Sequence, residues 1–447
     1  MKHASPKSLA PTRRSFLKNA ALATGGLLIL PTGFLRGQTA PSNRINIAAI
    51  GVGGMGFGDL TGVATAGGTI GAVCDVDAIR LARAQRAFPD AQAFADYREL
   101  FEKRGKDIDA VVVSTPDHLH FTIACTAVEL GKHVYVQKPM CHTVDQVRRL
   151  SSLAAEKKVA TQMGNQGQSS SHIRKAREWY EAGLIGAVSQ VEAWTNRPHW
   201  PQGMSAYRPV EKAPPHLDWN LWLGPVSERP YSPKIAPFDW RGYYEFGCGA
   251  LGDMGIHLIN DAFYVLSLTA PTKIEVEIPR PSAVAFPAKS TLTYHFPAHG
   301  DRGPVKLVWR EGGEKPPVPD GTDALPDNGS LILGSAAALS LSGWSDTFTP
   351  LVTAEKRAAL LAASPPTKYP RVKGSHYRNW LDAIRKGTQA SSHFGYAGPF
   401  AETILLGVIA QRLGRTLHWD AAAGRFTNDA EANQLLTAPP PRAGFLA

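Results

Sequence analysis

The sequence predicts an α/β fold in which a doubly wound parallel sheet is followed by an α+β part with mostly antiparallel strands. Three observations predict it. Apolar runs alternate with helical patterns over residues 46–165, a glycine-rich turn follows the first of those runs, and short strand patterns with turn-rich breaks dominate residues 273–333. Strands that are apolar at every position are typical of a parallel sheet covered on both faces.

The first element joins a buried strand to a glycine-rich turn. Ile47–Ile50 leads directly into a G-x-G-x-x-G pattern, and a second apolar run ends at Asp75. In this pattern the glycines permit a tight turn, close approach of a pyrophosphate and close helix packing, while the helix N-terminus favours phosphate charge. The spacing predicts a Rossmann dinucleotide site that includes Gly51, Gly53, Gly54, Met55 and Gly56.

Asp75 indicates which dinucleotide is bound. A carboxylate at this position accepts hydrogen bonds from the adenosine ribose hydroxyls and repels a 2′-phosphate. We therefore expect NAD, with NADP less favoured.

The remaining elements of the parallel sheet follow in order. The expected helices are 78–87, 97–103, 121–130 and 144–157, and the expected strands are 110–114, 133–136 and 159–163. Thr115-Pro116 and Gln137-Lys138-Pro139 follow two of these strands. Ligands bind beyond the carboxyl ends of such strands, so both loops are expected at the site.

The second part begins with a strand over 186–196 and a Pro-, Trp- and Tyr-rich cap over 197–245, a length of irregular chain that is usually functional. A helix over 254–268, strands over 273–278, 290–296, 305–310 and 330–333, and helices over 376–386 and 400–413 follow. Residues 314–328 are expected to form a surface loop.

Asp253 and His257 are four residues apart at the start of a predicted helix, so they share one face. His257 is a candidate general acid–base because the pKa of imidazole lies near neutrality, and Asp253 would orient it. The alternatives are a helix-capping Asp253 and a buried structural histidine.

Aromatic and polar side chains of the cap region suit a sugar, which has an apolar face and a rim of hydroxyls. The expected substrate-binding residues are Trp194, Asn196, Arg197, Arg241 and Asp261. For any one aromatic residue, core packing is at least as strong an interpretation as ligand contact. Four scattered cysteines and the spacing of the other ligand-type residues predict no metal site.

The order of the motifs, from the glycine turn through T-P-x-x-x-H and K-P to D-x-x-x-H, resembles the glucose–fructose oxidoreductase / inositol dehydrogenase (Gfo/Idh/MocA) family. The resemblance implies a Rossmann domain, then an α/β domain whose open, mostly antiparallel sheet often forms homo-oligomer contacts, and NAD(P)-dependent activity on sugars and polyols. It implies catalysis by Lys138, Asp253 and His257. Further cofactor contacts are expected from Thr115, Pro116, His120, Lys138 and Asn165.

The sequence departs from the family at Gln137, where many members have glutamate. A neutral amide there is expected to leave Lys138 less strongly cationic, so the role of this lysine stays open. The resemblance also extends to an exported branch of the family that includes NAD-dependent glycosidases.

Residues 1–40 are expected to form a twin-arginine export signal, with Arg13-Arg14 ahead of a short apolar run over 20–30. This route carries folded proteins, so we expect a periplasmic protein that folds in a reducing compartment, keeps free thiols and retains its cofactor. The expected domains are 43–167, binding NAD, and 168–436, binding substrate.

The formal net charge of +10 does not indicate nucleic-acid binding. Six of the cations lie within residues 1–40, which hold no acid, and no basic cluster follows. No segment after the signal is long and apolar enough to span a membrane, so no membrane partner is expected after export.

The main hypothesis is an NAD-dependent oxidoreductase acting on a sugar or polyol hydroxyl. The alternatives are a glycosidase that uses transient oxidation and elimination, and a non-catalytic sugar-binding regulator. The substrate itself is not readable from the sequence.

Overall fold

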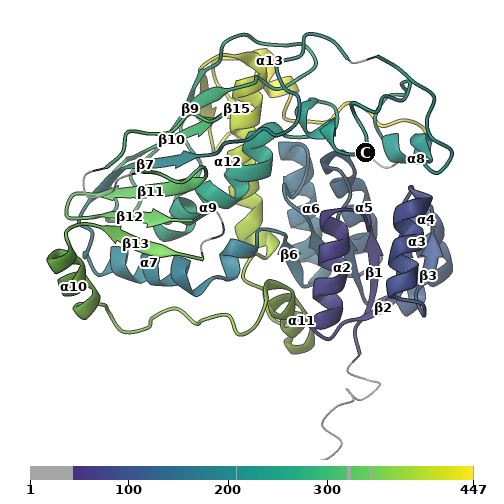
Figure 1. Cartoon of the computed structure of the whole chain (residues 1–447), viewed down its shortest axis with the longest axis horizontal. Helices are drawn as coiled ribbons and strands as arrows, with labels where there is room; N and C mark the ends of the chain where they lie inside the picture. Colours follow the sequence, from purple (N-terminus) through teal and green to yellow (C-terminus); the bar gives the residue numbers. More distant parts are fainter. Residues whose placement is uncertain (1–43, 208, 320–323, 343, 345, 446–447) are drawn as a thin grey trace, which may run out of the picture. The chain divides into compact units, whose positions relative to one another are not determined.

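The structure is a computed structural model that describes residues 44–207, 209–319, 324–342, 344 and 346–445. The expected export signal, residues 1–40, lies outside the described residues. Figure 1 shows the arrangement of the elements from residue 45 onward.

The first sheet has six parallel strands in the order β3-β2-β1-β4-β5-β6. Its strands are β1 (Asn46–Ile50), β2 (Thr69–Cys74), β3 (Gln92–Phe94), β4 (Ala110–Val113), β5 (His133–Val136) and β6 (Thr161–Met163). The predicted doubly wound sheet is confirmed. The strand order reverses between β1 and β4, which is where ligands bind in such sheets.

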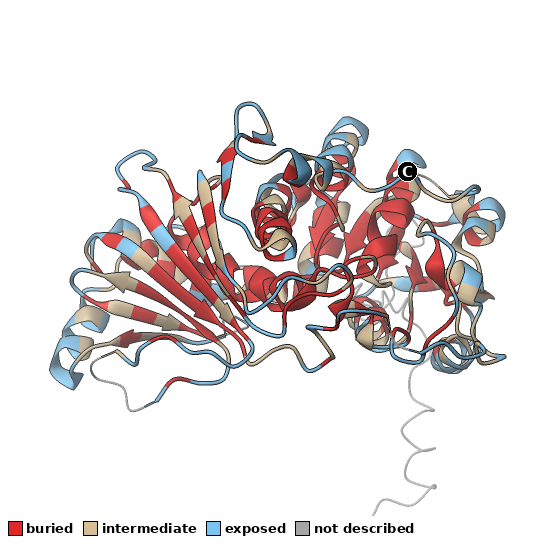
Figure 2. Cartoon of the chain, turned by 90° about the horizontal axis from the view of Figure 1, so that it is seen from above, coloured by how far each residue is buried: buried red, intermediate tan, exposed pale blue. Residues whose placement is uncertain are grey.

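Helices cover both faces of this sheet. They are α2 (Met55–Thr65), α3 (Ala78–Ala87), α4 (Tyr97–Arg104), α5 (Asp117–Glu129) and α6 (Val144–Lys157). The helix predicted from residue 121 begins four residues earlier, because Pro116 occupies the N-cap position and the polar Asp117 lies in the first turn. Figure 2 shows buried residues along the strands and exposed residues on the outer helices and loops.

The second sheet has nine strands in the order β13-β12-β11-β7-β10-β9-β8-β14-β15. They are β7 (Val188–Trp194), β8 (Lys273–Glu277), β9 (Ser290–Phe296), β10 (Val305–Glu311), β11 (Gly329–Gly334), β12 (Ala338–Leu341), β13 (Phe348–Leu351), β14 (Leu417–Asp420) and β15 (Arg425–Phe426). The predicted mostly antiparallel character is confirmed, although β10 pairs in parallel with β7.

Further helices follow the first sheet. They are α7 (Ser171–Glu181), α8 (Trp219–Leu223), α9 (Ile256–Val265), α10 (Ala354–Ala362), α11 (His376–Lys386), α12 (Phe394–Leu413) and α13 (Ala430–Gln434). The long α12 contacts α6 and β6 on one side and β8 and β9 on the other. The prediction began this helix at Phe400, directly after Pro399. The helix in fact begins six residues earlier, at Phe394, and contains Pro399.

Residues 197–245 are mostly irregular, and several of them form a hydrophobic cluster together with Phe246 and Ala285. The members from within the segment include Trp222, Tyr231 and Trp240. All four cysteines are buried free thiols. Within the described part of the chain, no helix combines the length and apolarity needed to cross a bilayer.

Candidate active site

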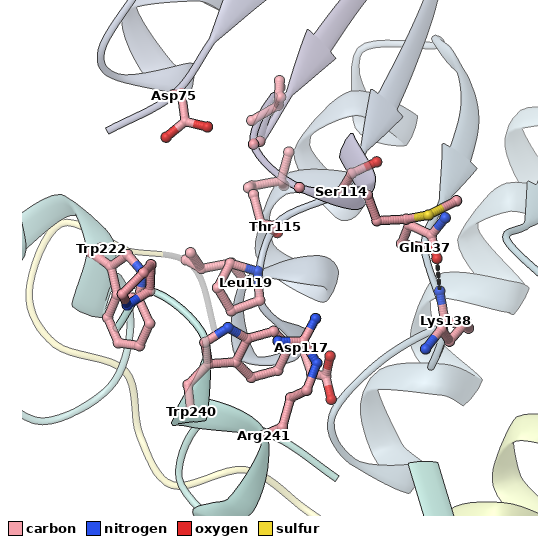
Figure 3. Close-up of a pocket in the computed structure, with 18 of the residues that line it drawn as sticks. Asp75, Ser114, Thr115, Asp117, Leu119, Gln137, Lys138, Trp222, Trp240 and Arg241 are labelled. Carbon is pink, nitrogen blue, oxygen red and sulfur yellow. Dashed lines mark hydrogen bonds between the residues drawn. The ribbon is translucent and has the colours of Figure 1, made fainter. Parts of the chain in front are cut away.

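A cavity of about 520 Å³ opens at the carboxyl ends of β1, β4 and β5, where the strand order reverses (Figure 3). At one end it is lined by the glycine turn and Asp75. At the other end it is lined by Lys138, Asp253 and His257. The structure therefore brings the predicted nucleotide motif and the three predicted catalytic residues into one cavity.

The glycine turn has the backbone that the motif requires. Gly51 has a φ of 79°, in the left-handed region, and a Cβ at Gly56 would lie 1.9 Å from the Gly51 carbonyl oxygen. Only glycine permits α2 to begin this close to β1. Gly51, Gly53, Gly54 and Met55 line the cavity, whereas Gly56 packs beneath the turn.

Asp75 both lines the cavity and fixes the turn. One of its carboxylate oxygens accepts a hydrogen bond from the Val52 amide and the other from the Asp77 amide, each at 2.9 Å. Burial raises the pKa of Asp75, and the two amides oppose that shift. The carboxylate is held rigidly at the mouth of the turn.

Lys138 and Asp253 form an ion pair inside the cavity. The Lys138 ammonium donates to the Asp253 Oδ1 at 2.5 Å and to the Asp253 carbonyl at 3.0 Å. Burial works to raise the pKa of Asp253, but the charges of Lys138 and Arg241 outweigh it and lower that pKa. Asp253 is therefore ionised and holds the lysine in place.

Asp253 lies in a π-helical turn, Leu251–Gly255, that runs directly into α9. Such turns are frequent at functional sites. A Cβ at Gly252 would lie 2.2 Å from Cβ of Cys248, so glycine permits the close packing of this turn. The predicted helix start at Met254 becomes a π turn followed by α9.

His257 is buried, and its Nδ1 has no hydrogen-bond partner among the described residues. Burial, together with the charge of Lys138, lowers the pKa of His257 to about 3. The imidazole is therefore neutral at pH 7, and its pKa lies well below the near-neutral value expected from the sequence, because burial and the Lys138 charge disfavour the protonated ring. The ring of Trp344, from the segment between β12 and β13, lies edge-on to it at 4.6 Å and also lines the cavity.

Asp117 is a further acid in the cavity, and the sequence analysis gave it no role. It begins α5, and its Oδ2 accepts a hydrogen bond from the Cys248 amide at 3.1 Å. Burial raises its pKa to about 7, although Arg241 and Lys138 oppose the shift. Its position directly after Thr115-Pro116, at the end of a strand, was a signal that could have identified it.

Two predicted cofactor residues lie outside the cavity lining. The ring nitrogens of His120 lie 2.7 Å from the Pro139 carbonyl and 2.9 Å from the Thr115 carbonyl, so the ring bridges the loops after β4 and β5. Asn165 is buried and bonds to the side chains of Asn260 and Ser392. Its neighbour Gln166 lines the cavity instead.

Three predicted substrate residues also lie outside it. Trp194 is fully buried and donates to the Pro326 carbonyl at 2.8 Å. Asp261 is buried and accepts from the Ser330 hydroxyl at 3.2 Å. Asn196 accepts from Arg197 at 2.7 Å, and it is Arg197 that lines the cavity, as Arg241 does.

Some lining residues were not anticipated at all. Trp344 and Phe445 reach the cavity from chain segments that carry no motif, and Arg80 reaches it from α3. Among the described residues, no group of three or more His, Cys, Asp or Glu side chains is arranged to hold a metal ion.

Comparisons with known proteins agree with this architecture. A family model described as an oxidoreductase family, NAD-binding Rossmann fold (GFO_IDH_MocA), matches residues 45–165. A second, described as the oxidoreductase family C-terminal alpha/beta domain, matches residues 172–301.

Among curated relatives, levoglucosan dehydrogenase of Pseudarthrobacter phenanthrenivorans is 25% identical over 190 residues, 41% of this chain and 39% of that protein. A glycosyl hydrolase family 109 protein of Saccharopolyspora erythraea is 31% identical over 202 residues, 40% of this chain and 44% of that protein. The chain spans about half the length, or less, of these relatives.

Solved structures show the same fold. Levoglucosan dehydrogenase in complex with NADH and levoglucosan aligns with a TM-score of 0.56 at 17% identity, covering 84% of this chain and 99% of that one. The WlbA dehydrogenase of Bordetella pertussis, in complex with NADH and UDP-GlcNAcA, aligns with a TM-score of 0.59 at 14% identity over the same shares.

Proposed function

Because this chain belongs to the Gfo/Idh/MocA family of oxidoreductases, we propose that it oxidises a hydroxyl group of a sugar or polyol with a retained NAD. One observation carries the proposal. The Lys138, Asp253 and His257 side chains meet in the same cavity that the dinucleotide-type glycine turn lines.

The residues of the cavity fit a dinucleotide. The buried hydroxyl of Thr115, between the turn and Lys138, has no partner among the described residues and is free to bond a ligand. The Gly51-to-Met55 turn supplies the close backbone approach for a pyrophosphate, and Asp75 supplies a ribose acceptor that disfavours a 2′-phosphate. NAD, when bound, supplies the hydride acceptor.

The chain's own residues would handle the proton. Oxidation removes a hydride from the carbon and a proton from its hydroxyl, leaving a carbonyl. Lys138 would hold the hydroxyl oxygen as negative charge develops on it, with Asp253 fixing the ammonium. Neutral His257 would accept the proton, and Asp117, with a pKa of about 7, is the second group able to carry it at neutral pH.

Residues 442–445 support a retained cofactor. Arg442 donates to the Gly224 and Asn220 carbonyls, and Arg98 donates to the Gly444 carbonyl at 2.9 Å. These bonds hold Phe445 against the end of the cavity that Asp75 lines. Held there, residues 442–445 would form a strap that slows release of the nucleotide. An enzyme that carries its cofactor into the periplasm requires such retention.

We also propose assembly of identical subunits through the nine-stranded sheet. The helices α7, α9 and α12 pack against strands of this sheet, and buried and half-buried residues alternate along β9. The half-buried set, Thr291, Thr293 and His295, therefore lies on the opposite face, available to a second subunit.

A glycosidase is the second candidate, because one relative, 31% identical over part of its length, is named a glycosyl hydrolase family 109 protein. The same lysine, aspartate and histidine would serve the first oxidation. The hydride would return at the end, with no net change of the cofactor.

The test is mass spectrometry of products from a panel of sugars, polyols and glycosides, with cofactor absorbance followed at the same time. The proposal expects a product two hydrogens lighter and one NADH formed per product. Cleavage of a glycoside without an added acceptor would favour the second candidate, and no reaction together with no NAD binding would refute both.

A further inference from the structure

A buried carboxylate beneath the cavity connects three separate elements. Asp59, in α2, is fully buried. It accepts hydrogen bonds from the Ser114 hydroxyl at 2.7 Å, from the Gln137 amide nitrogen at 2.9 and 3.1 Å, and from the Tyr377 hydroxyl at 2.8 Å. Ser114 follows β4, Gln137 follows β5 and Tyr377 belongs to α11.

The Gln137 side-chain amide links Asp59 to Lys138. Its nitrogen faces Asp59, and its oxygen accepts a hydrogen bond from the Lys138 backbone amide at 3.1 Å, the contact drawn as a dashed line in Figure 3. An ionised carboxylate offers acceptors only, so it fixes which end of the amide points toward Lys138. A Cβ at Gly164 would lie 2.7 Å from the Gln137 carboxamide, so this side chain is also confined by packing.

We infer that Asp59 is a positioning residue for Lys138: its buried negative charge orients the Gln137 amide, which in turn holds the Lys138 turn. Asp59 and Gln137 form a matched pair, because a glutamate at position 137 would place a second carboxylate within hydrogen-bond distance of the first. This inference rests on the proposed function for the role of Lys138.

The charge of Asp59 also reaches the lysine. Burial raises the pKa of Asp59, whereas its three hydrogen-bond donors and the charge of Lys138 lower it. The charge of Lys138 also acts on Asp253, Asp117, His257 and His120. Removing the Asp59 charge should therefore make the Lys138 amine reactive at lower pH.

The experiment measures acetylation of Lys138 by acetic anhydride across pH, mapped by peptide mass spectrometry on the full chain with matched nucleotide content. The variants are Asp59→Asn, Gln137→Glu and the exchange of both. Glu311→Gln is the control, since it removes another fully buried carboxylate that bonds to Trp309 and Gln411 rather than near Lys138. Melting temperatures are recorded for all variants.

The inference expects the labelling midpoint of Lys138 to fall by about 0.5 pH unit or more in Asp59→Asn. The double exchange should return it to the wild-type value or above, while Glu311→Gln leaves it unchanged. Gln137→Glu alone should lower the melting temperature, and the exchange should recover it. If Asp59→Asn fails to fold, the Lys138 labelling midpoint of the exchange variant tests the inference.

A midpoint that stays at the wild-type value in a folded Asp59→Asn variant, or one that falls below it in the exchange variant, would overturn the inference and reduce Asp59 to a packing residue. The labelling needs no substrate, so the result is independent of the proposed function. If labelling behaves as expected but no sugar is oxidised and no NAD binds, the proposed function fails while the Asp59–Lys138 coupling stands.

Discussion

The Lys138 ammonium contacts the Asp253 carboxylate at 2.5 Å, although the two residues are 115 positions apart in the chain. Lys138 follows β5 of the parallel sheet, and Asp253 lies in the π turn before α9. The reactive end of the cavity therefore exists only when both parts of the chain are packed together.

Replacing either Lys138 or His257 by alanine should lower turnover roughly 10²-fold, the size expected for loss of a positioned proton-transfer or charge-stabilising group. The double variant should lose little more, because both act on one transition state. Because the cofactor is proposed to be retained, the rate of a single turnover, followed as NADH formation under saturating sugar, checks this. Near-wild-type turnover in His257→Ala would assign that residue to structure.

Asp75→Ala should weaken NAD binding about tenfold and narrow the difference between NAD and NADP, because the ribose acceptor is lost. It should also destabilise the fold by about 1–3 kcal/mol, since the Val52 and Asp77 amides lose their acceptor. Fluorescence titration with both nucleotides measures the first effect. Asp429→Ala, which removes a cap of α13, is the control and should leave nucleotide preference unchanged.

Phe445→Ala and Arg442→Ala should speed dissociation of NAD, because both loosen the segment held against the cavity. Stopped-flow displacement of bound nucleotide gives the rate, and we expect an increase of about tenfold, which corresponds to about 1.4 kcal/mol of lost binding free energy. Arg415→Ala removes an arginine paired elsewhere, with Asp429, and serves as the control. Equal NAD dissociation rates in all variants would show that residues 442–445 do not slow release of the nucleotide.

Trp344→Ala should raise KM for the sugar about tenfold with little change in NAD affinity, because an exposed aromatic face beside His257 is a platform for a sugar ring. Trp344→Phe keeps an aromatic ring and should retain most of the affinity. An effect on NAD binding equal to that on KM would place Trp344 in the cofactor site instead.

The contribution of Glu311 to the free energy of unfolding should fall as pH rises from about 4.5 to about 7. Burial raises the pKa of Glu311 to about 7, so the unfolded chain releases this proton at lower pH than the folded protein does. The loss for this group is on the order of 3 kcal/mol, and it is complete above pH 7. Denaturant titrations of the wild type and of Glu311→Gln across this range measure that contribution as the difference between the two pH profiles. The buried histidines, whose lowered pKa values act in the opposite direction, contribute equally to both.

Several strands, helices and turns could be predicted because the residues within each segment determine its structure. β9 was predicted with its observed bounds, Ser290–Phe296, from its strand pattern and the turn-rich segments on either side. The glycine turn, β5 and α6 were equally explicit. The helix α7 was missed although Ser170 caps it and Ile173, Ala176 and Trp179 have helical spacing.

Features that depend on distant packing were not readable. Asp59 looks like a surface residue in α2, and its burial depends on Tyr377, 318 positions away. Trp194 sits in an aromatic-rich segment typical of a sugar site, yet it packs beside Leu325 and Leu331. The parallel pairing of β10 with β7 and the approach of Trp344 to His257 are likewise set by tertiary contacts.

Transfer of a hydride from the sugar to NAD in this cavity is the central claim, and isotope tracing tests it most directly. A panel sugar carrying deuterium on its ring carbons is incubated with the full chain, and the nucleotide released on denaturation is analysed by mass spectrometry. We expect NADH one mass unit heavier in the wild type, formed roughly 10²-fold more slowly in Lys138→Ala. Nucleotide that carries no deuterium, while the sugar is converted, would contradict it.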